Sequence, residues 1–173
     1  MELSLTVEDQ RIFLRGLENA ILRVENSRYF ETERGYQGAL IAELQNELTS
    51  FNWDNAIIEQ EYQKRIRPHG IRVRPGIIIH VPFNSDEHNT RGEGNFVVFE
   101  LKLNARENAA LTDLENLSQM CSLLNYPLGV FININASSTH LDKYDGENKD
   151  KLVGYSVNLN NDQVSFVKEQ TTA

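Results

Sequence analysis

Two opposite charges interrupt the apolar stretch from Phe96 to Leu103 (FVVFELKL), which its composition predicts to be a β-strand. Side chains of a strand alternate between its two faces, so Glu100 and Lys102 lie next to each other on one face. On a solvated edge strand such residues form a simple ion pair. On an interior strand they are costly unless they are paired or serve a function. The apolar strand predicted before this one, and the helix predicted after it, favour the interior position.

A further acidic candidate comes from a helix that the sequence predicts from about Thr32 to Thr49. Glu33 and Gln37 are one helical turn apart and continue the apolar stripe of this helix towards its N-terminus. The helix dipole also favours an acidic residue in the first turn, whatever its function. Both interpretations of Glu33 stay open at this stage.

The stretch GIRVRPGIIIHVPF contains an unexpected glycine. Its isoleucines predict a buried strand from Ile77 to Val81, and Gly76 stands just before it. Glycine weakens a strand, and it often marks a bulge or the close approach of another group. His80 shares a strand face with Gly76 in this pattern and is an auxiliary candidate, although a histidine there is more often an ordinary core residue.

A run of basic side chains without an intervening acid precedes the same strand; it comprises Lys64, Arg65, Arg67, Arg72 and Arg74. Such a run is usually a solvated turn, but next to a functional site it would serve as a strip that contacts phosphates. The net charge of -8 argues against a protein that binds nucleic acid through its overall electrostatics.

The composition is that of an ordinary globular protein, and we expect a single domain over residues 1–173. Hydrophobic residues make up 40% of the chain and charged residues 24%. The single cysteine, Cys121, leaves no internal disulfide and favours a reducing compartment. We see no signal-peptide pattern, and the apolar runs are too short to cross a bilayer. The expected location is therefore cytoplasmic, without membrane contact.

The apolar periodicity predicts the element order α-α-β-β-β-α-β-β-β. The expected helices cover Val7–Glu25, Thr32–Thr49 and Glu107–Asn125, and the expected strands cover Ile57–Arg65, Ile77–Val81, Phe96–Leu103, Leu128–Ile134, Leu152–Leu159 and Gln163–Val167. Because a helical crossover joins parallel neighbours, the order predicts an α/β fold with a central mixed sheet flanked by helices.

Four segments in this order resemble the common core of the PD-(D/E)XK, or restriction-endonuclease-like, nuclease superfamily. They are ETERGYQGALIAEL, RPGIIIH, FELK and YPLGVFINI, and they span Glu31 to Ile134. The resemblance implies a restriction-endonuclease-like core and hydrolysis of phosphodiester bonds that depends on Mg²⁺ or Mn²⁺. It also implies nucleic acid as a partner, DNA in the first place, and either a homodimer or a partner subunit.

The resemblance assigns roles to individual residues. Glu100 matches the metal-binding acid, Lys102 matches the lysine that positions or activates the attacking water, and Glu33 matches an acid on a helix. Gln37 and His80 would be auxiliary residues, and the basic strip would contact phosphates. The Asp of the Pro-Asp motif is replaced by Gly76, so one metal ligand is missing. Candidate replacements elsewhere in the chain are Glu59, Glu61, Asp86, Glu87, Glu93 and His80.

Three functional hypotheses therefore remain open. The first is a metal-dependent nuclease, active or impaired by the glycine, because Mg²⁺ needs only one or two carboxylates beside water and phosphate. The second is an inactive nuclease-fold protein that binds nucleic acid or serves as a subunit. The third is a protein-interaction module in which Glu100 and Lys102 form a structural ion pair.

Overall fold

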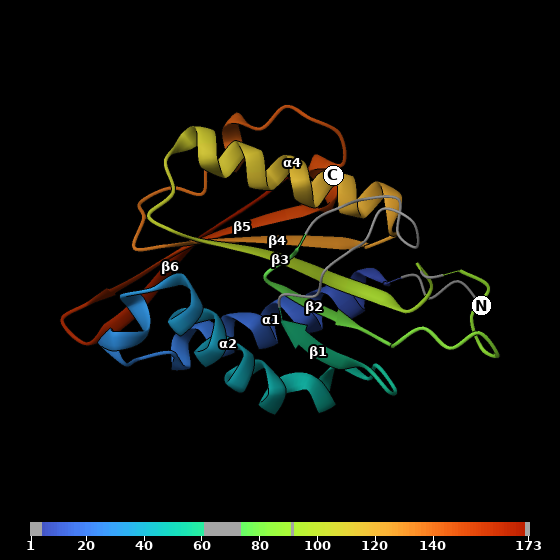
Figure 1. The fold of residues 1–173 in the computed structure, drawn as a ribbon. Helices are drawn as coiled ribbons and strands as arrows, with labels where there is room; N and C mark the ends of the chain where they lie inside the picture. The colour runs from blue at the N-terminus through green and yellow to red at the C-terminus, as the bar shows by residue number, and fades with distance from the viewer. Residues whose placement is uncertain (1–4, 61–73, 91, 172–173) are drawn as a thin grey trace.

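A six-stranded mixed sheet, covered by helices on both faces, forms the centre of the protein (Figure 1). The computed structural model describes residues 5–60, 74–90 and 92–171. The helices are α1 (Val7–Arg23), α2 (Glu33–Glu47) and α4 (Glu107–Leu123), with short 3₁₀ turns η1 (Ser27–Phe30), η2 (Leu48–Phe51), η3 (Leu141–Lys143) and η4 (Lys149–Lys151). The strands are β1 (Ile57–Gln60), β2 (Ile77–His80), β3 (Asn95–Leu103), β4 (Leu128–Ile134), β5 (Leu152–Asn160) and β6 (Gln163–Gln170). The predicted α/β class and the order of the main elements are confirmed.

The strands lie in the sheet in the same order as in the chain. β1, β2 and β3 pair antiparallel, β3, β4 and β5 pair parallel, and β5 and β6 form an antiparallel hairpin. Helix α4 is the crossover between β3 and β4, as predicted. The second parallel connection, from β4 to β5, is made by residues 135–151, which contain η3 and η4.

Two hydrophobic clusters hold the layers together, one on each face of the sheet. Helices α1 and α2 pack on one face, and α4 packs on the other (Figure 1). On β3, Val97, Phe99 and Leu101 face α1 and α2, whereas Val98 faces α4. In the described part of the chain, no helix combines the length and the apolar character needed to cross a membrane.

Phe96 departs from the predicted alternation of β3. The sequence placed it on the face of Val98, but it packs in the cluster of α1 and α2, stacked on Trp53 with ring centroids 4.4 Å apart. The pairing register shifts at this point, since Ile79 pairs with Val97 and the next residue, His80, pairs with Asn95. Phe96 is thus an extra residue in a bulge, and a bulge turns a side chain out of the regular alternation.

Local capping fixes where the helices begin. Thr6 and Asp9 form a capping box at the start of α1, with Asp in the place of the usual Glu or Gln. Thr32 caps α2 by accepting a hydrogen bond from the backbone N–H of Gly35 at 3.0 Å. A Cβ at Gly35 would lie 2.8 Å from the Thr32 hydroxyl oxygen, so a glycine permits this close approach. The cap makes Glu33 the first residue of α2.

A buried asparagine on β4 anchors the segment that leads into α4. Asn133 is fully buried and pairs with Lys102 in the β3–β4 register. Its side chain accepts a hydrogen bond from the N–H of Ala105 at 2.8 Å and donates to the carbonyls of Ala105 and Ser138 at 3.0 and 2.9 Å. These bonds fix the start of α4 relative to the end of β3.

Asn133→Ala should lower the free energy of unfolding by about 2–4 kcal/mol, because it leaves a buried N–H and two carbonyls without partners. Urea denaturation followed by circular dichroism measures the change. Asn108→Ala, at an exposed position in the first turn of α4, should change stability by less than about 0.5 kcal/mol. Equal effects of the two substitutions would show that Asn133 does not anchor this segment.

Candidate active site

Glu100 and Lys102 lie side by side on the face of β3 that α4 covers, and α4 brings a third charged group to them. This group is Asp113, which is only 6% exposed and lies among the buried residues of α4. Its Oδ2 atom is 3.8 Å from Nζ of Lys102, which is itself 39% exposed. A carboxylate on an interior strand, a lysine with access to solvent and a buried aspartate therefore meet between the sheet and α4.

The electrostatics of this cluster are unusual for acidic side chains. The pKa of Glu100 is raised to about 8, mainly by burial and also by the carboxylates of Asp113 and Glu33, whereas Lys102 lowers it. The pKa of Asp113 is raised to about 6, mainly by burial and also by Glu33, whereas Lys102 lowers it. The lysine thus does not offset the cost of burying Glu100 and Asp113. Perturbed carboxyl groups of this kind are more frequent at functional sites.

The structure places Gly76 where β2, β3 and α2 meet. Its N–H donates a hydrogen bond to the carbonyl of Phe99 at 3.0 Å. A Cβ at Gly76 would lie 2.9 Å from Oε1 of Gln37 on α2 and 3.0 Å from Cδ1 of Leu101. Gly76 lies in a bend just before β2, so the alternation of side chains along β2 does not extend to it. Gly76 therefore does not share a strand face with His80, contrary to the expectation. Gln37, an auxiliary candidate, is therefore brought directly to Gly76.

His80 and Glu59 are used elsewhere in the sheet. Nε2 of the buried His80 lies 2.6 Å from Oε2 of Glu59, across the β1–β2 pair. This contact gives both side chains a partner away from Gly76. Neither of them is brought into the group around Glu100.

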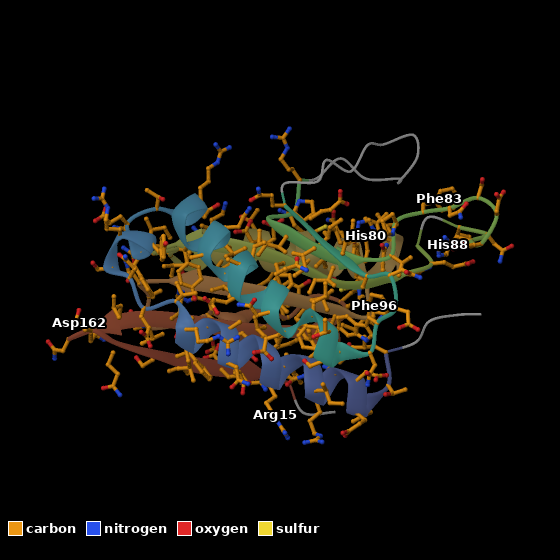
Figure 2. All side chains as sticks on the ribbon, turned by 90° about the horizontal axis from the view of Figure 1, so that it is seen from below. Arg15, His80, Phe83, His88, Phe96 and Asp162 are labelled. Atoms are coloured by element: carbon orange, nitrogen blue, oxygen red, sulfur yellow. The ribbon has the colours of Figure 1, made fainter. Side chains whose placement is uncertain are left out.

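The acids of the β2–β3 loop are not brought to Gly76 either. This loop follows the end of β2 that is distant from Gly76, and Figure 2 shows it projecting from the body of the protein at Phe83 and His88. Glu93 accepts a hydrogen bond from the backbone N–H of Asn89 within the loop at 3.1 Å, and Asp86 and Glu87 are exposed there. Among the basic candidates, Arg74 is exposed two residues before Gly76. Glu61 and the basic residues Lys64, Arg65, Arg67 and Arg72 lie outside the described residues.

Asp113 is the site residue that the sequence analysis missed. A signal was present, because Ala110, Asp113, Leu114 and Leu117 follow the i, i+3, i+4, i+7 spacing of a buried helix face. An acid inside such a stripe is unusual, since aspartate is rarely buried without a partner.

The cluster offers a pair of carboxylates rather than a closed metal cage. Within the described ranges, no three histidine, cysteine, aspartate or glutamate side chains lie close enough together to hold one metal ion. Oδ2 of Asp113 is buried and accepts no hydrogen bond. A buried carboxylate oxygen that accepts no hydrogen bond and has only the Lys102 ammonium group at 3.8 Å fits a hard divalent cation that takes its remaining ligands from water and phosphate.

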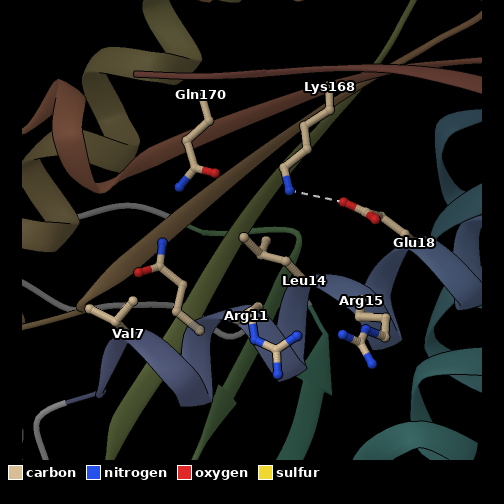
Figure 3. Close-up of a pocket in the computed structure, with 8 residues that line it drawn as sticks. Val7, Arg11, Leu14, Arg15, Glu18, Lys168 and Gln170 are labelled. Carbon is tan, nitrogen blue, oxygen red and sulfur yellow. Dashed lines mark hydrogen bonds and ion pairs between the residues drawn. The ribbon is translucent and has the colours of Figure 1, made fainter. Parts of the chain in front are cut away.

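The described residues line a surface hollow of about 410 Å³ between α1 and β6, where Lys168 donates to Glu18 at 3.0 Å (Figure 3). They also line a hollow of about 620 Å³ that includes Leu103 and Asn104, the two residues that follow Lys102. Neither hollow is lined by Glu100, Lys102, Asp113 or Glu33.

The cluster predicts how stability depends on pH in metal-free buffer. The Glu100 carboxyl of the unfolded chain titrates near 4.5, whereas its pKa in the folded protein is about 8, so the folded state keeps the proton longer. Stability that is fully present below pH 4.5 should therefore be lost as the pH rises through 8. In Glu100→Gln this titration is absent, and Tm measured with a chelator at pH 8 should exceed that of the wild type by a few degrees.

The two proteins should differ much less at pH 4.5, where Glu100 is protonated in the wild type. Glu43→Gln, which alters an exposed ion pair with Arg23 at 2.7 Å, serves as the control and should leave the slope of Tm against pH unchanged. Parallel curves for the wild type and Glu100→Gln would refute the raised pKa.

No protein-family model matches the sequence, and no curated protein matches it significantly. Among solved structures, the chain is similar to NucC of E. coli MS115-1 in its cAAA-bound form, with 14% identity and a TM-score of 0.48, over 98% of this chain and 86% of that one. It is also similar to NucC of P. aeruginosa ATCC27853 in its cAAA-bound form, with 11% identity and a TM-score of 0.41, over 98% of this chain and 85% of that one. These similarities are distant, so a function for this chain has to be sought in its own site.

Proposed function

We propose that this protein is a metal-dependent nuclease that hydrolyses phosphodiester bonds of nucleic acid, with DNA as the favoured substrate. The observation that carries the proposal is the cluster of Glu100, Lys102, Asp113 and Glu33 around an interior strand. Ionised carboxylates that lie close together repel one another, and this lowers the stability of the folded protein unless a cation or a proton neutralises them. A divalent cation does so, and the resemblance of the Glu-x-Lys strand to PD-(D/E)XK nucleases gives the cation its chemical use.

Each residue of the cluster has a task in this scheme. A bound Mg²⁺ or Mn²⁺ would lower the pKa of water and stabilise negative charge on the phosphate. Glu100, on a strand packed on both faces, would hold the cation in a fixed position. Lys102 is partly exposed and presents a compact point charge that can orient the attacking water or bind a phosphate oxygen. Glu33 would add negative charge from the start of α2.

Substrate binding would involve the basic strip that precedes β2. Arg74, the member of this strip in the described part of the chain, is exposed and lies two residues before Gly76. A guanidinium group at that position can contact a phosphate of a strand whose scissile bond lies at Glu100. Such contacts are local, so they are compatible with the acidic net charge of the whole chain.

The direct test is cleavage of supercoiled plasmid and of labelled single strands in Mn²⁺ and Mg²⁺. Glu100→Gln and Lys102→Met should each reduce the rate by at least about 100-fold, because each removes a group at the reacting centre. Glu107→Gln is the matched control, since Glu107 lies at the start of α4 and pairs with Lys143 on the surface at 2.6 Å. It should cleave at the wild-type rate.

A second candidate is a nuclease-fold protein that binds nucleic acid, or a partner protein, without cutting. The glycine at position 76 favours it, because one acid of the resembling family is missing there. Absence of cleavage by the wild type under all metal conditions, together with retained DNA binding, would support this candidate and contradict the nuclease. Cleavage that Glu100→Gln abolishes would exclude it.

Binding to duplex DNA should weaken as salt rises, and Arg74→Glu should lower the affinity and reduce the slope of log K against log[salt] by about one unit. Fluorescence anisotropy at several salt concentrations measures both quantities. Arg11→Glu, on α1 beside the hollow of Figure 3, is a control with the same change of charge. Equal losses of affinity in the two variants would indicate a general charge effect and no phosphate contact at Arg74.

A further inference from the structure

The space beside Gly76 is already filled. The nearest atoms to a Cβ at this position would be Oε1 of Gln37 and Cδ1 of Leu101, at 2.9 and 3.0 Å. Both distances are shorter than an ordinary van der Waals contact. An acid at position 76 would thus require Gln37 to move. The segment from Gly76 to the end of β2 contains no acidic residue, so it supplies no carboxylate to the site.

Helix α4 supplies one from the other side of β3. Asp113 is 94% buried, and its Oδ2 atom has no hydrogen-bond partner. The ammonium group of Lys102 lies 3.8 Å from this atom, which is beyond hydrogen-bond distance. A buried carboxylate oxygen that accepts no hydrogen bond and has only this longer ion pair costs free energy, which a bound cation would offset.

Four other acids near these elements already have partners. Glu59 contacts His80 at 2.6 Å, and Glu93 accepts the N–H of Asn89. On α4 itself, Glu107 pairs with Lys143, and Glu115 accepts the hydroxyl of Tyr144 at 2.9 Å. Glu33, at the start of α2, is only half-buried, whereas Asp113 is buried and lies 3.8 Å from Lys102 of the Glu-x-Lys strand. Asp113 is therefore the better-placed second ligand among the described residues.

We propose that Asp113 on α4 replaces the acid missing at Gly76 and, together with Glu100 on β3, forms the binding site for a divalent cation. This inference rests on the proposed function and specifies its metal site. Two carboxylates suit Mg²⁺ or Mn²⁺, which fill their remaining positions with water and substrate phosphate. The absence of a third ligand within reach in the described part of the chain keeps these positions open.

Isothermal titration of Mn²⁺ into the metal-free protein tests the site without any measurement of cleavage. The wild type should bind one ion, and Asp113→Asn and Glu100→Gln should each weaken Mn²⁺ binding by roughly tenfold or more. Glu115→Gln, two residues from Asp113 on the same helix but exposed, should bind Mn²⁺ as the wild type does. Circular dichroism and thermal unfolding establish that each variant is folded.

The titration separates failure of this inference from failure of the proposed function. If Asp113→Asn keeps the wild-type affinity and Glu100→Gln loses it, the proposed function stands and the role of Asp113 is wrong. If the wild type binds no Mn²⁺, both are wrong.

A rescue experiment tests whether Asp113 and position 76 serve the same ion. Gly76→Asp is introduced into the Asp113→Asn protein together with Gln37→Ala, which removes the nearer of the two side chains that would contact the new Cβ. The triple variant should regain most of the Mn²⁺ affinity, to within about fivefold of the wild type. A folded triple variant that binds no better than Asp113→Asn would contradict the replacement.

Discussion

The arrangement of this protein depends on one constraint, the burial of the Glu100 carboxyl on an interior strand beside other acids. Such a group must keep a proton, find a compensating charge or bind a cation. Lys102 compensates only in part, since the pKa of Glu100 still lies near 8. The elements around it do not relieve the charge. They bring more acids to it, which lowers the stability of the ionised form.

The parts that hold this cluster are structurally ordinary and well satisfied. Asn133 uses its whole amide group to fix the start of α4, and Thr32 caps α2 so that Glu33 is its first residue. Rigid supports of this kind are what a catalytic group needs to stay in register. The supports are fully hydrogen-bonded, whereas Oδ2 of Asp113 accepts no hydrogen bond and has only the ion pair with Lys102 at 3.8 Å; under the proposed function, this is where stability is exchanged for function.

The sequence predicted the features that depend on local periodicity. Alternation along β3 placed Glu100 and Lys102 on one face, and the helical crossover predicted the parallel pairing of β3 and β4. Features that depend on how distant segments meet were missed. The bulge at Phe96 arises from pairing with β2. The space beside Gly76 is filled by the side chain of Gln37, which comes from α2. Asp113 could be recognised only as an acid in an apolar stripe, because its contact with the Glu-x-Lys strand is long-range.

The central claim is that Asp113 supplies the second carboxylate of the cation site beside Glu100. Anomalous diffraction from Mn²⁺-soaked crystals at pH 8.5 tests this claim most directly. The account predicts a single strong peak between the carboxylates of Glu100 and Asp113, within about 2.0–2.3 Å of an oxygen of each. A crystal without a peak there, or with its peak between His80 and Glu59 instead, would contradict it.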